Sequence, residues 1–518
     1  MVVDRNETIQ AQLLGTEASR ERALAEHGTF EPELTGSAQR VSNRRPNTVE
    51  QQRNLAGVPI LDEKNWLYDA GIETFTTTGA KVRLGYTLNN FNNNLTPLGD
   101  PTATGRTDEW QGFGGVSLTQ PLLKNGGRNV TLANLRLAAI ASESSFQEYR
   151  RQLMVALSQA ESAYWGVYFA QEQLQFLDES VAVAESLLAD SREKVKAGKG
   201  ADLDVLEAEA GLALRRAKRN DALQKHSEAL GQLLVFAGET PLSTKVVFVA
   251  VDDPDTNFPK PTYTEAWKNA LELNPDYIIQ KKKVDEALVR LGVARNQRLP
   301  ELNLKGSYGM NGLGTSPGEA FDEITNGSFP SWSVGLEFRL PLGGGIRGRH
   351  ELAAMLATTG QARLQLQAIE TQLANALNTS MNKLAHTRAT ASDYRTMIRF
   401  NEDLLKTEKD RVALGKVEGR RVLEVEAGLF EVKQGLAETQ VQARRAALEL
   451  YLAEGSTLQR RGLEFTADEL RDQTLVLMGK GKKQKPTKAT GFSKASIQRT
   501  SARFAPSRLD LRNDPANR

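Results

Sequence analysis

The sequence predicts a mainly α-helical protein built from two related halves, each with a long helical hairpin and a few β-strands. The first observation is an internal repeat, because residues 193–212 align without a gap with residues 410–429 and about half of the positions are identical. The second is a proline-free stretch of roughly 70 residues in each half, at 127–196 and 346–413. The third is an alternating apolar and polar segment that ends at proline and glycine before each stretch.

Length and composition bound the class of protein. The chain has 518 residues, of which 40% are hydrophobic and 25% charged, so it is not disordered throughout, and its length suits two or three domains or one elongated body. A formal net charge of +2 gives no sign of a nucleic-acid partner. No run of about 18 uncharged apolar residues is present, which excludes a membrane-crossing helix but leaves the shorter strands of a β-barrel open. The absence of cysteine excludes disulfides, thiolate metal sites and a cysteine nucleophile.

The two long proline-free stretches predict rods. A helix of about 70 residues is on the order of 100 Å long, which no compact domain accommodates. In the first stretch, apolar residues from Leu153 to Leu188 are spaced by threes and fours, apart from Gln171 inside the series. The second stretch has a weaker seam around Leu373, interrupted at Ser380. We expect each rod to be packed along its seam and wet on its other side.

Each rod ends at a glycine-containing turn, after which a second helix begins. Gly198 and Gly415 are expected to take the left-handed conformation that closes a helix, and Asp202 is expected to be the N-cap of the next. The return helices complete hairpins over 127–239 and 346–454.

The repeats divide the chain into four parts. The first repeat covers residues 1–240, an equatorial linker 241–262, the second repeat 263–455 and a C-terminal extension 456–518. A helix over about 263–297 is expected to lead into the second set of strands. From Gly479 the extension carries 11 Lys or Arg against two Asp without periodicity, which predicts a disordered basic tail. Such a tail either binds a polyanion, such as peptidoglycan or lipid headgroups, or only keeps the protein soluble.

Five short segments are expected to be strands. They lie at about 32–43, 70–93, 110–121, 300–310 and 331–341, and within the second of them 72–90 has the pattern of an additional hairpin found only in the first half.

The strands alternate as the wall of a membrane barrel would. In the last segment Val334, Leu336 and Phe338 share one face, while Glu337 lies on the other. A soluble β-sandwich would show the same alternation. Tryptophan near one end of the strands, at positions 110 and 332, is typical of a membrane interface but also of a soluble core.

The ordered and duplicated segments LTQPLL, AGKGADLDVLEAEAGL, ARNQRLPELNLKGSYG and VGLEFRLPLGGG resemble the TolC family of outer-membrane efflux proteins, over about residues 5–455. The resemblance implies a mainly α fold with a membrane β-barrel portion. Duplicated helical hairpins would form a periplasmic α-barrel, and strands would be contributed to a shared barrel of a homotrimer in outer-membrane lipid. Few strands per chain agree with this, because exposed strand edges are not tolerated in lipid. A passive exit duct for efflux or type I secretion is implied. It would be coupled through a periplasmic adaptor, or membrane fusion protein, to an inner-membrane RND or ABC transporter.

The resemblance also implies where the duct closes. In the family the helical turns at the periplasmic end, here 197–206 and 414–423, form the aperture and the adaptor-docking surface. The residues implied for docking and for the strand-to-helix transitions are Gly198, Lys199, Gly415 and Lys416, with Pro121 and Pro341.

The second turn departs from the family pattern. Where family members commonly place aspartate, this chain has Arg421, preceded by Arg420 and followed by Glu424. Our hypothesis is that one of these arginines pairs with Asp202, Asp204 or Glu424 of a neighbouring hairpin and locks the closed state. The alternative is a solvated helix start with no gating role.

No pattern predicts an enzyme, a cofactor or a metal site. The four histidines are scattered and never form an HExxH pattern, and the AGKGAD turn lacks the phosphate-binding GxxxxGK[ST] pattern. The structurally different rival is a soluble coiled-coil scaffold, which the lack of a visible signal peptide would favour. However, the first helix is already under way at Arg5. We therefore expect an incomplete start, which leaves open whether a lipid-bearing cysteine belongs to the protein.

Overall fold

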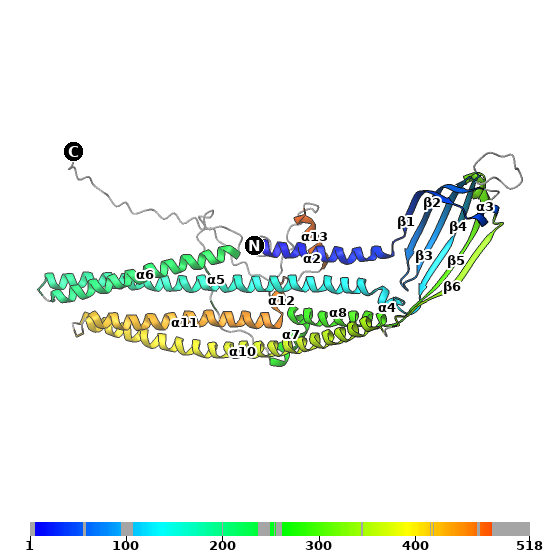
Figure 1. The fold of residues 1–518 in the computed structure, drawn as a ribbon. Coiled ribbons are helices and arrows are strands. Elements are labelled where there is room, and N and C mark those ends of the chain that lie inside the picture. The colour runs from blue at the N-terminus through cyan, green and yellow to red at the C-terminus, as the bar shows by residue number, and fades with distance from the viewer. Residues whose placement is uncertain are drawn as a thin grey trace, which may run out of the picture.

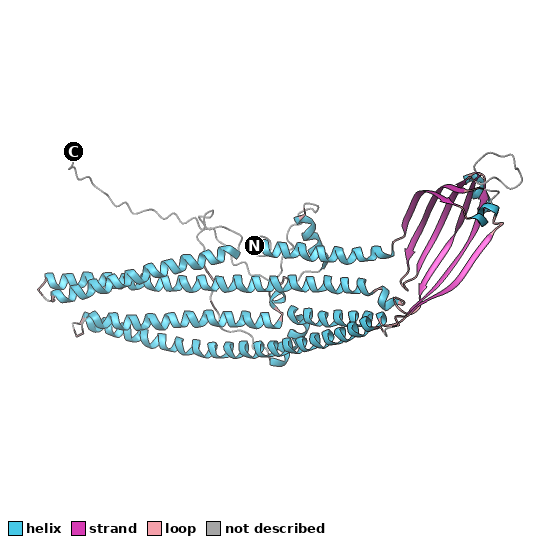
Figure 2. Cartoon of the chain, viewed as in Figure 1, coloured by secondary structure: helices cyan, strands magenta, loops and turns pink. Residues whose placement is uncertain are grey.

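The protein is elongated, with a β-sheet at one end and two long helical hairpins that run away from it (Figure 1, Figure 2). The computed structural model describes residues 6–54, 58–94, 107–198, 200–236, 249–252, 254, 262–342, 345–414, 416–417, 419–463 and 467–478. Both hairpin turns lie at the end opposite the sheet (Figure 1). No helix among the described residues is long and apolar enough to cross a bilayer.

The first hairpin follows the predicted seam. Its helices are α5 (Ala133–Lys196) and α6 (Asp202–Phe236), preceded by the short α4 (Arg128–Thr131). Six of the predicted seam positions are buried in α5: Leu153, Ala160, Val167, Leu177, Ala184 and Leu188. Gln171, which interrupts the seam, holds the linker: its side chain accepts a hydrogen bond from the Ala250 N–H at 2.9 Å and donates one to the Ala250 carbonyl. The predicted end of the return helix, residue 239, and most of 241–262 lie outside the described residues.

The second hairpin consists of α10 (Ile346–Ala413) and α11 (Gly419–Glu454). The 68 residues of α10 correspond to about 100 Å of helix. Ser380, which weakened the predicted seam, is buried in it, and its hydroxyl donates to the Ala376 carbonyl at 2.7 Å. A polar residue is tolerated there because its donor is satisfied within the helix.

The helix expected over 263–297 is wrong in one respect, because it is two helices, α7 (Tyr263–Leu273) and α8 (Pro275–Gln297). Asn274 ends α7 in an extended conformation and caps α8, accepting a hydrogen bond from the Tyr277 N–H. Proline lacks the N–H that a continuous helix needs and disfavours helical backbone in the residue before it, so α7 must end there.

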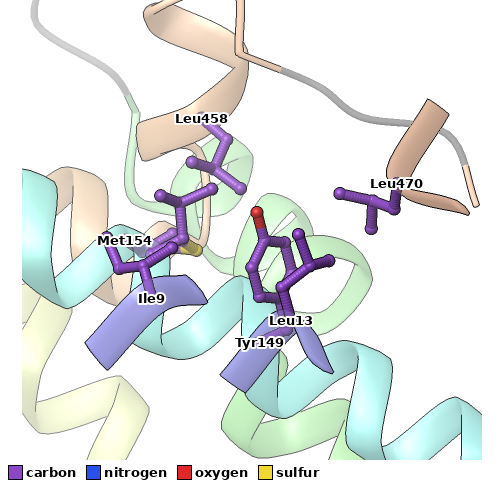
Figure 3. Close-up of a cluster of buried hydrophobic side chains, with 7 residues drawn as sticks. Ile9, Leu13, Tyr149, Met154, Leu458 and Leu470 are labelled. Carbon is purple, nitrogen blue, oxygen red and sulfur yellow. The ribbon is translucent and has the colours of Figure 1, made fainter. Parts of the chain in front are cut away.

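The termini of the described chain meet at the middle of the molecule. Helix α2 (Glu7–Ala25) continues into the 3-10 turn η1 (Glu26–Phe30), and the extension forms α12 (Thr457–Arg460) and α13 (Ala467–Leu477). Figure 3 shows their shared apolar cluster, made of Ile9, Leu13, Tyr149, Leu153, Met154, Leu458 and Leu470. The predicted basic tail from Gly479 lies outside the described residues.

Among the described residues, the sheet has six antiparallel strands in sequence order. They are β1 (Glu33–Pro46), β2 (Ile60–Phe75), β3 (Lys81–Asn93), β4 (Thr107–Pro121), β5 (Glu301–Gly314) and β6 (Pro330–Arg339), with α3 (Val49–Asn54) and α9 (Pro317–Asn326) between strands. The first half therefore has two strands more than the second. They form the hairpin β2–β3, which is longer than the predicted 72–90, because β2 begins at Ile60, where it pairs with Pro46 of β1.

Candidate functional site

The two faces of the sheet differ in chemistry from the first strand to the last. Residues paired across antiparallel strands share a face. One row of such pairs runs through all six strands and consists of exposed apolar or aromatic side chains: Leu34, Ile72, Leu84, Val116, Tyr308 and Trp332. The adjacent row, on the opposite face, is polar: Glu33, Glu73, Arg83, Ser117, Ser307 and Ser333. The sheet thus has one apolar face and one polar face that is compatible with water.

Ion pairs confirm which face is wet. Lys81 and Glu73 are 2.8 Å apart, Lys305 and Glu337 are 2.6 Å apart, and Arg83 pairs with Asp69. All of these side chains belong to the polar face by register. Charged pairs at a surface are compatible with water and costly in lipid.

Aromatic side chains gather at the end of the apolar face that is remote from the helices. Trp66 stacks on Tyr68 with ring centroids 5.9 Å apart, and Tyr68 stacks on Trp110 at 6.4 Å. Trp332 also lies on the apolar face, but it pairs with Tyr308, six residues before Gly314, which is the partner of Trp110. The two tryptophans singled out in the sequence therefore share one face, and Trp110 is the one that belongs to the aromatic group at the remote end, where a membrane interface is expected.

The strand-to-helix transition at Pro121 is held by backbone and amide hydrogen bonds. Pro121 is the last residue of β4, and the following Leu122 N–H donates to the Leu302 carbonyl at 2.8 Å. The Asn125 N–H donates to Asn296 Oδ1 at 2.7 Å, and Asn296 Nδ2 donates to the Leu123 carbonyl. The exit of β4 is thus fastened to the end of α8. In the second half Pro341 follows the end of β6 by two residues.

At the first helical turn, Gly198 adopts the predicted left-handed conformation, with φ of +73°. Asp202 is not the N-cap, because α6 begins at Asp202 itself. The Asp204 carboxylate accepts the N–H of Ala201 at 3.1 Å, so it is Asp204 that reaches back to satisfy the backbone before the helix. Lys199 lies outside the described residues.

At the second turn, both arginines pair with one carboxylate of their own helix. Arg420 Nε lies 3.2 Å from Glu424 Oε1, and Arg421 Nη1 lies 3.1 Å from Glu424 Oε2. Within one chain, Glu424 of the same helix is therefore the partner of both arginines, and pairing with a neighbouring hairpin stays a prediction. These are exposed pairs at three and four residues' spacing, which stabilise a helix only slightly. Lys416 closes α10 through its N–H, which donates to the Arg411 carbonyl, and Gly415 lies outside the described residues.

The strongest contact between the hairpins near these turns was not predicted from the sequence. Arg215 of α6 donates to Ser180 of α5 at 3.0 Å and to Glu426 of α11 at 3.2 Å, and the side chains of Arg215 and Glu426 are each only 12% exposed. One guanidinium therefore connects three helices. The sequence offers no signal for this contact, since even at the neighbouring Gly211 a Cβ would make only ordinary van der Waals contacts, 3.5 Å from the Arg215 guanidinium and 3.7 Å from Leu423.

Burial raises the pKa of the Glu426 carboxyl, although the charges of Arg215 and Lys409 act in the opposite direction. A second contact lies nearby, where Phe176 of α5 meets Phe430 of α11 edge to face, with centroids 6.4 Å apart. The two hairpins are thus joined close to their turns by one buried ion pair and one aromatic pair.

Among the described residues, no group of three or more His, Asp or Glu side chains is placed to hold a metal ion. The structure has a sheet with one apolar and one polar face, joined to long helical hairpins. This arrangement suits the wall of a channel.

Comparison with known proteins agrees. The chain matches the outer membrane efflux protein family over residues 1–239 and 266–456. The chain belongs to this family. It is 24% identical over 333 residues to the proteases secretion protein PrtF of Dickeya chrysanthemi, covering 63% of this chain and 69% of that one. It is 22% identical over 458 residues to the outer membrane efflux protein BepC of Brucella suis, covering 88% and 90%. Among solved structures, the CmeC outer membrane channel of Campylobacter jejuni has the same fold, with a TM-score of 0.58, 14% identity and coverage of 91% and 87%.

Membership of this family indicates where the sheet and the helical hairpins are located. The protein is an outer-membrane channel protein for efflux or secretion, with its sheet in the outer membrane and its helical part in the periplasm. Family members are channels rather than enzymes. The apolar face of the sheet accordingly suits contact with lipid, and the polar face suits contact with water. The family favours this function over the soluble scaffold that the sequence had left open.

Proposed function

We propose that three copies of this chain form a passive exit duct in which each contributes its sheet to one closed barrel. The observation that carries this is the pair of strand edges, β1 and β6, which no other described part of the chain covers, on a sheet whose apolar face is exposed. Backbone N–H and C=O groups at such edges are costly in lipid, and only closure satisfies them.

The number of strands suits closure by identical copies. Because the sheet has six antiparallel strands, β6 of one copy runs antiparallel to β1 of the next. Three sheets give eighteen strands, a number at which a barrel encloses a water-filled passage. Pairing β6 of each copy with β1 of the next would also place the apolar faces of all three sheets on the outside of the barrel and the polar faces on the inside.

Unpartnered apolar side chains on the hairpins point to the same assembly. Leu203, Leu206 and Leu214 are exposed on α6, and Leu364 and Phe400 are exposed on α10. Single copies rarely leave such residues in water over long helices, and neighbouring hairpins of a trimer would cover them. The hairpins would then form one continuous α-barrel in the periplasm.

The duct is proposed to work with a periplasmic adaptor and an inner-membrane RND or ABC pump, as is typical of the family. Docking would use the two turns, with Gly198, Lys199, Gly415 and Lys416. The aperture would combine acids of the first turn, Asp202 and Asp204, with Arg420, Arg421 and Glu424 of the second. The class of molecule that the duct exports is left open, since relatives include a protease secretion protein and the nickel-cobalt-cadmium resistance protein NccC.

Cysteine cross-linking tests the closed barrel, because the natural chain contains no cysteine. Ala38→Cys in β1 is combined in turn with Trp332→Cys, Val334→Cys or Leu336→Cys in β6, all on the apolar face. Paired residues of antiparallel strands are close enough for a disulfide. Oxidation is expected to give covalent trimers for one of these combinations. The matched control, Ser37→Cys with the same partners, places the thiols on opposite faces and should remain monomeric on denaturing gels.

Absence of covalent trimers from every combination, in protein that is folded and in membranes, would contradict the shared barrel. Planar-bilayer recording of the purified protein tests the duct itself. Discrete steps of small conductance are expected from a channel closed at its periplasmic end, and persistent silence would count against it.

A further inference from the structure

A groove of about 410 Å³ lies where the sheet meets the helices. It is formed by the chain segment that leaves β4, residues 126–130, and by the last turns of α8. Two arginines line it, Arg128 and Arg295, together with Asn129 and Leu299. The Asn125 N–H donates to Asn296 Oδ1, and Gln297 Nε2 donates to Asn125 Oδ1, so these two segments are fastened to each other.

The cations of this groove have no acidic partner. In the part of the chain that the structure describes, neither Arg128 nor Arg295 forms an ion pair, and the same holds for Lys124 and Arg298 nearby. The first turn of α10 adds positive charge and lies against Arg298. A Cβ added at Gly348 would lie only 3.3 Å from the Cα of Arg298. Positively charged side chains that line one groove without an acidic partner make the groove attractive to an anion.

Both halves of the chain build this feature in the same way. After the proline at each strand exit comes a glycine turn and then arginine at the start of the helix, as in 126–128 and 345–349. Neither α4 nor α10 has an acidic residue in its first turn. A helix start favours negative charge, so the helix dipole does not explain these arginines, although Arg347 also pairs with Glu351 of its own helix at 3.9 Å.

Exposed leucines lie in or next to the chain segments that form this junction. Leu122, Leu123 and Leu299 are exposed beside the groove, and Leu342, after β6, is 99% exposed. The lipid-facing side of the sheet also ends here, with Leu302 paired to Phe338 at the helix-proximal ends of β5 and β6. Cations next to apolar side chains, at the edge of a lipid-facing surface, match a molecule that has a phosphate and an acyl chain.

We propose that this junction groove binds a phosphate group between Arg128 and Arg295. Its place in the fold favours the headgroup of a phospholipid in the periplasmic leaflet, and free phosphate is the other source of the same chemistry. The inference rests on the outer-membrane placement of the sheet. Guanidinium groups bind phosphate oxygens through two parallel hydrogen bonds, which neutral side chains do not reproduce. Bound headgroups would fix the depth at which the duct sits in the bilayer.

The test uses the full-length protein purified in a neutral detergent. Phosphatidylglycerol, diacylglycerol with the same acyl chains and inorganic phosphate are titrated separately, with bound ligand counted by native mass spectrometry and thermal stability followed in parallel. The variant is Arg128→Gln with Arg295→Gln. The control removes the same charge elsewhere, through Arg363→Gln with Arg399→Gln, two exposed arginines of α10.

Phosphatidylglycerol is expected to bind about tenfold more weakly to the groove variant than to the natural or control protein, and diacylglycerol to bind all three poorly. Equal affinity of phosphatidylglycerol for the variant and the control would overturn the proposal. Binding of diacylglycerol to the natural protein as tightly as phosphatidylglycerol would overturn it too. Binding of inorganic phosphate that matches phosphatidylglycerol and is lost in the variant would support the site and overturn the lipid as its source. Barrel formation is scored separately by the cysteine cross-link, so failure of the groove and failure of the duct are distinguishable.

Discussion

The two helical hairpins begin their return helices with nearly the same residues, VLEAEAGL in α6 and VLEVEAGL in α11, yet equivalent glutamates have different surroundings. Glu209 is 46% exposed and pairs with Arg192 of its own hairpin at 2.6 Å. Its counterpart Glu426 is 12% exposed and pairs with Arg215 of the other hairpin. The repeated sequence thus sets the hairpin, while the packing of one hairpin against the other decides what each glutamate does.

The two copies of the repeat also differ at two further positions. Phe430, which meets Phe176 of the first hairpin, corresponds in the repeat to Ala213, and Arg421 at the second turn corresponds to Asp204 at the first. Each difference lets the second hairpin make a contact that the first does not make. Substitution at these positions shows how much of the tip's stability comes from contact between hairpins rather than within them.

The largest effect is expected from Arg215→Ala, because it leaves Glu426 buried without its partner. Removing one member of a buried ion pair costs about 3–5 kcal/mol, whereas Arg192→Ala breaks an exposed pair that contributes under about 1 kcal/mol. Denaturant unfolding of the purified protein, followed by helical circular dichroism, measures both. Equal losses from the two substitutions would mean that the cross-hairpin pair is no more important than a surface pair.

Next in size is Phe430→Ala, which gives α11 the residue that α6 has at this position. Loss of a half-buried aromatic side chain and of its edge-to-face partner is expected to lower stability by about 2 kcal/mol. In a double-mutant cycle, Phe176→Ala should cost less in the Phe430→Ala background than alone. Additive losses would show that the two rings do not stabilise each other.

A smaller effect is expected from pH. Since burial raises the pKa of Glu426, the folded protein keeps a proton that the unfolded chain has already released. The contribution of this group to stability therefore grows as the pH falls through the raised value and is lost as the pH rises through it. The difference in melting temperature between the natural protein and Glu426→Gln should accordingly become more favourable to the natural protein on acidification. A difference that is constant with pH would contradict this.

The smallest effect on stability is expected from Arg421→Asp, which gives the second turn the residue of the first. It breaks only an exposed pair with Glu424, so the cost should be under about 1 kcal/mol. Its effect on ion selectivity should be clear, since three copies would replace positive charge by negative charge at the proposed aperture. Reversal potentials in a salt gradient should shift toward cations, and an unchanged reversal potential would remove Arg421 from the aperture.

Much of the fold follows from short-range patterns in the sequence. The seam from Leu153 to Leu188, the left-handed Gly198 and the two-faced strands depend on spacings of two, three or four residues, which a sequence displays directly. The break before Pro275 was equally legible, and the prediction of one helix there gave too little weight to the proline.

The site was predicted less completely, because its contacts join residues far apart in the chain. Glu424 was named as a partner of the second-turn arginines on a neighbouring hairpin, which stays a prediction, and within one chain it pairs with them on its own helix. Asp202 was given the position before the helix that Ala201 occupies. Arg215 was not named at all, since nothing in its local pattern indicates a carboxylate 211 residues away.

The sequence by itself determined the duplicated plan, the lengths of the hairpins and the alternation of the strands, because these depend on the periodicity of apolar side chains and on turn residues. Only the tertiary structure decided which polar residues are buried and with whom. Gln171 interrupts an apolar seam in order to bind the linker at Ala250, and Glu426 leaves its own hairpin for Arg215. Burial makes such pairings strong and specific, and burial is a property of how the helices pack, not of any single helix.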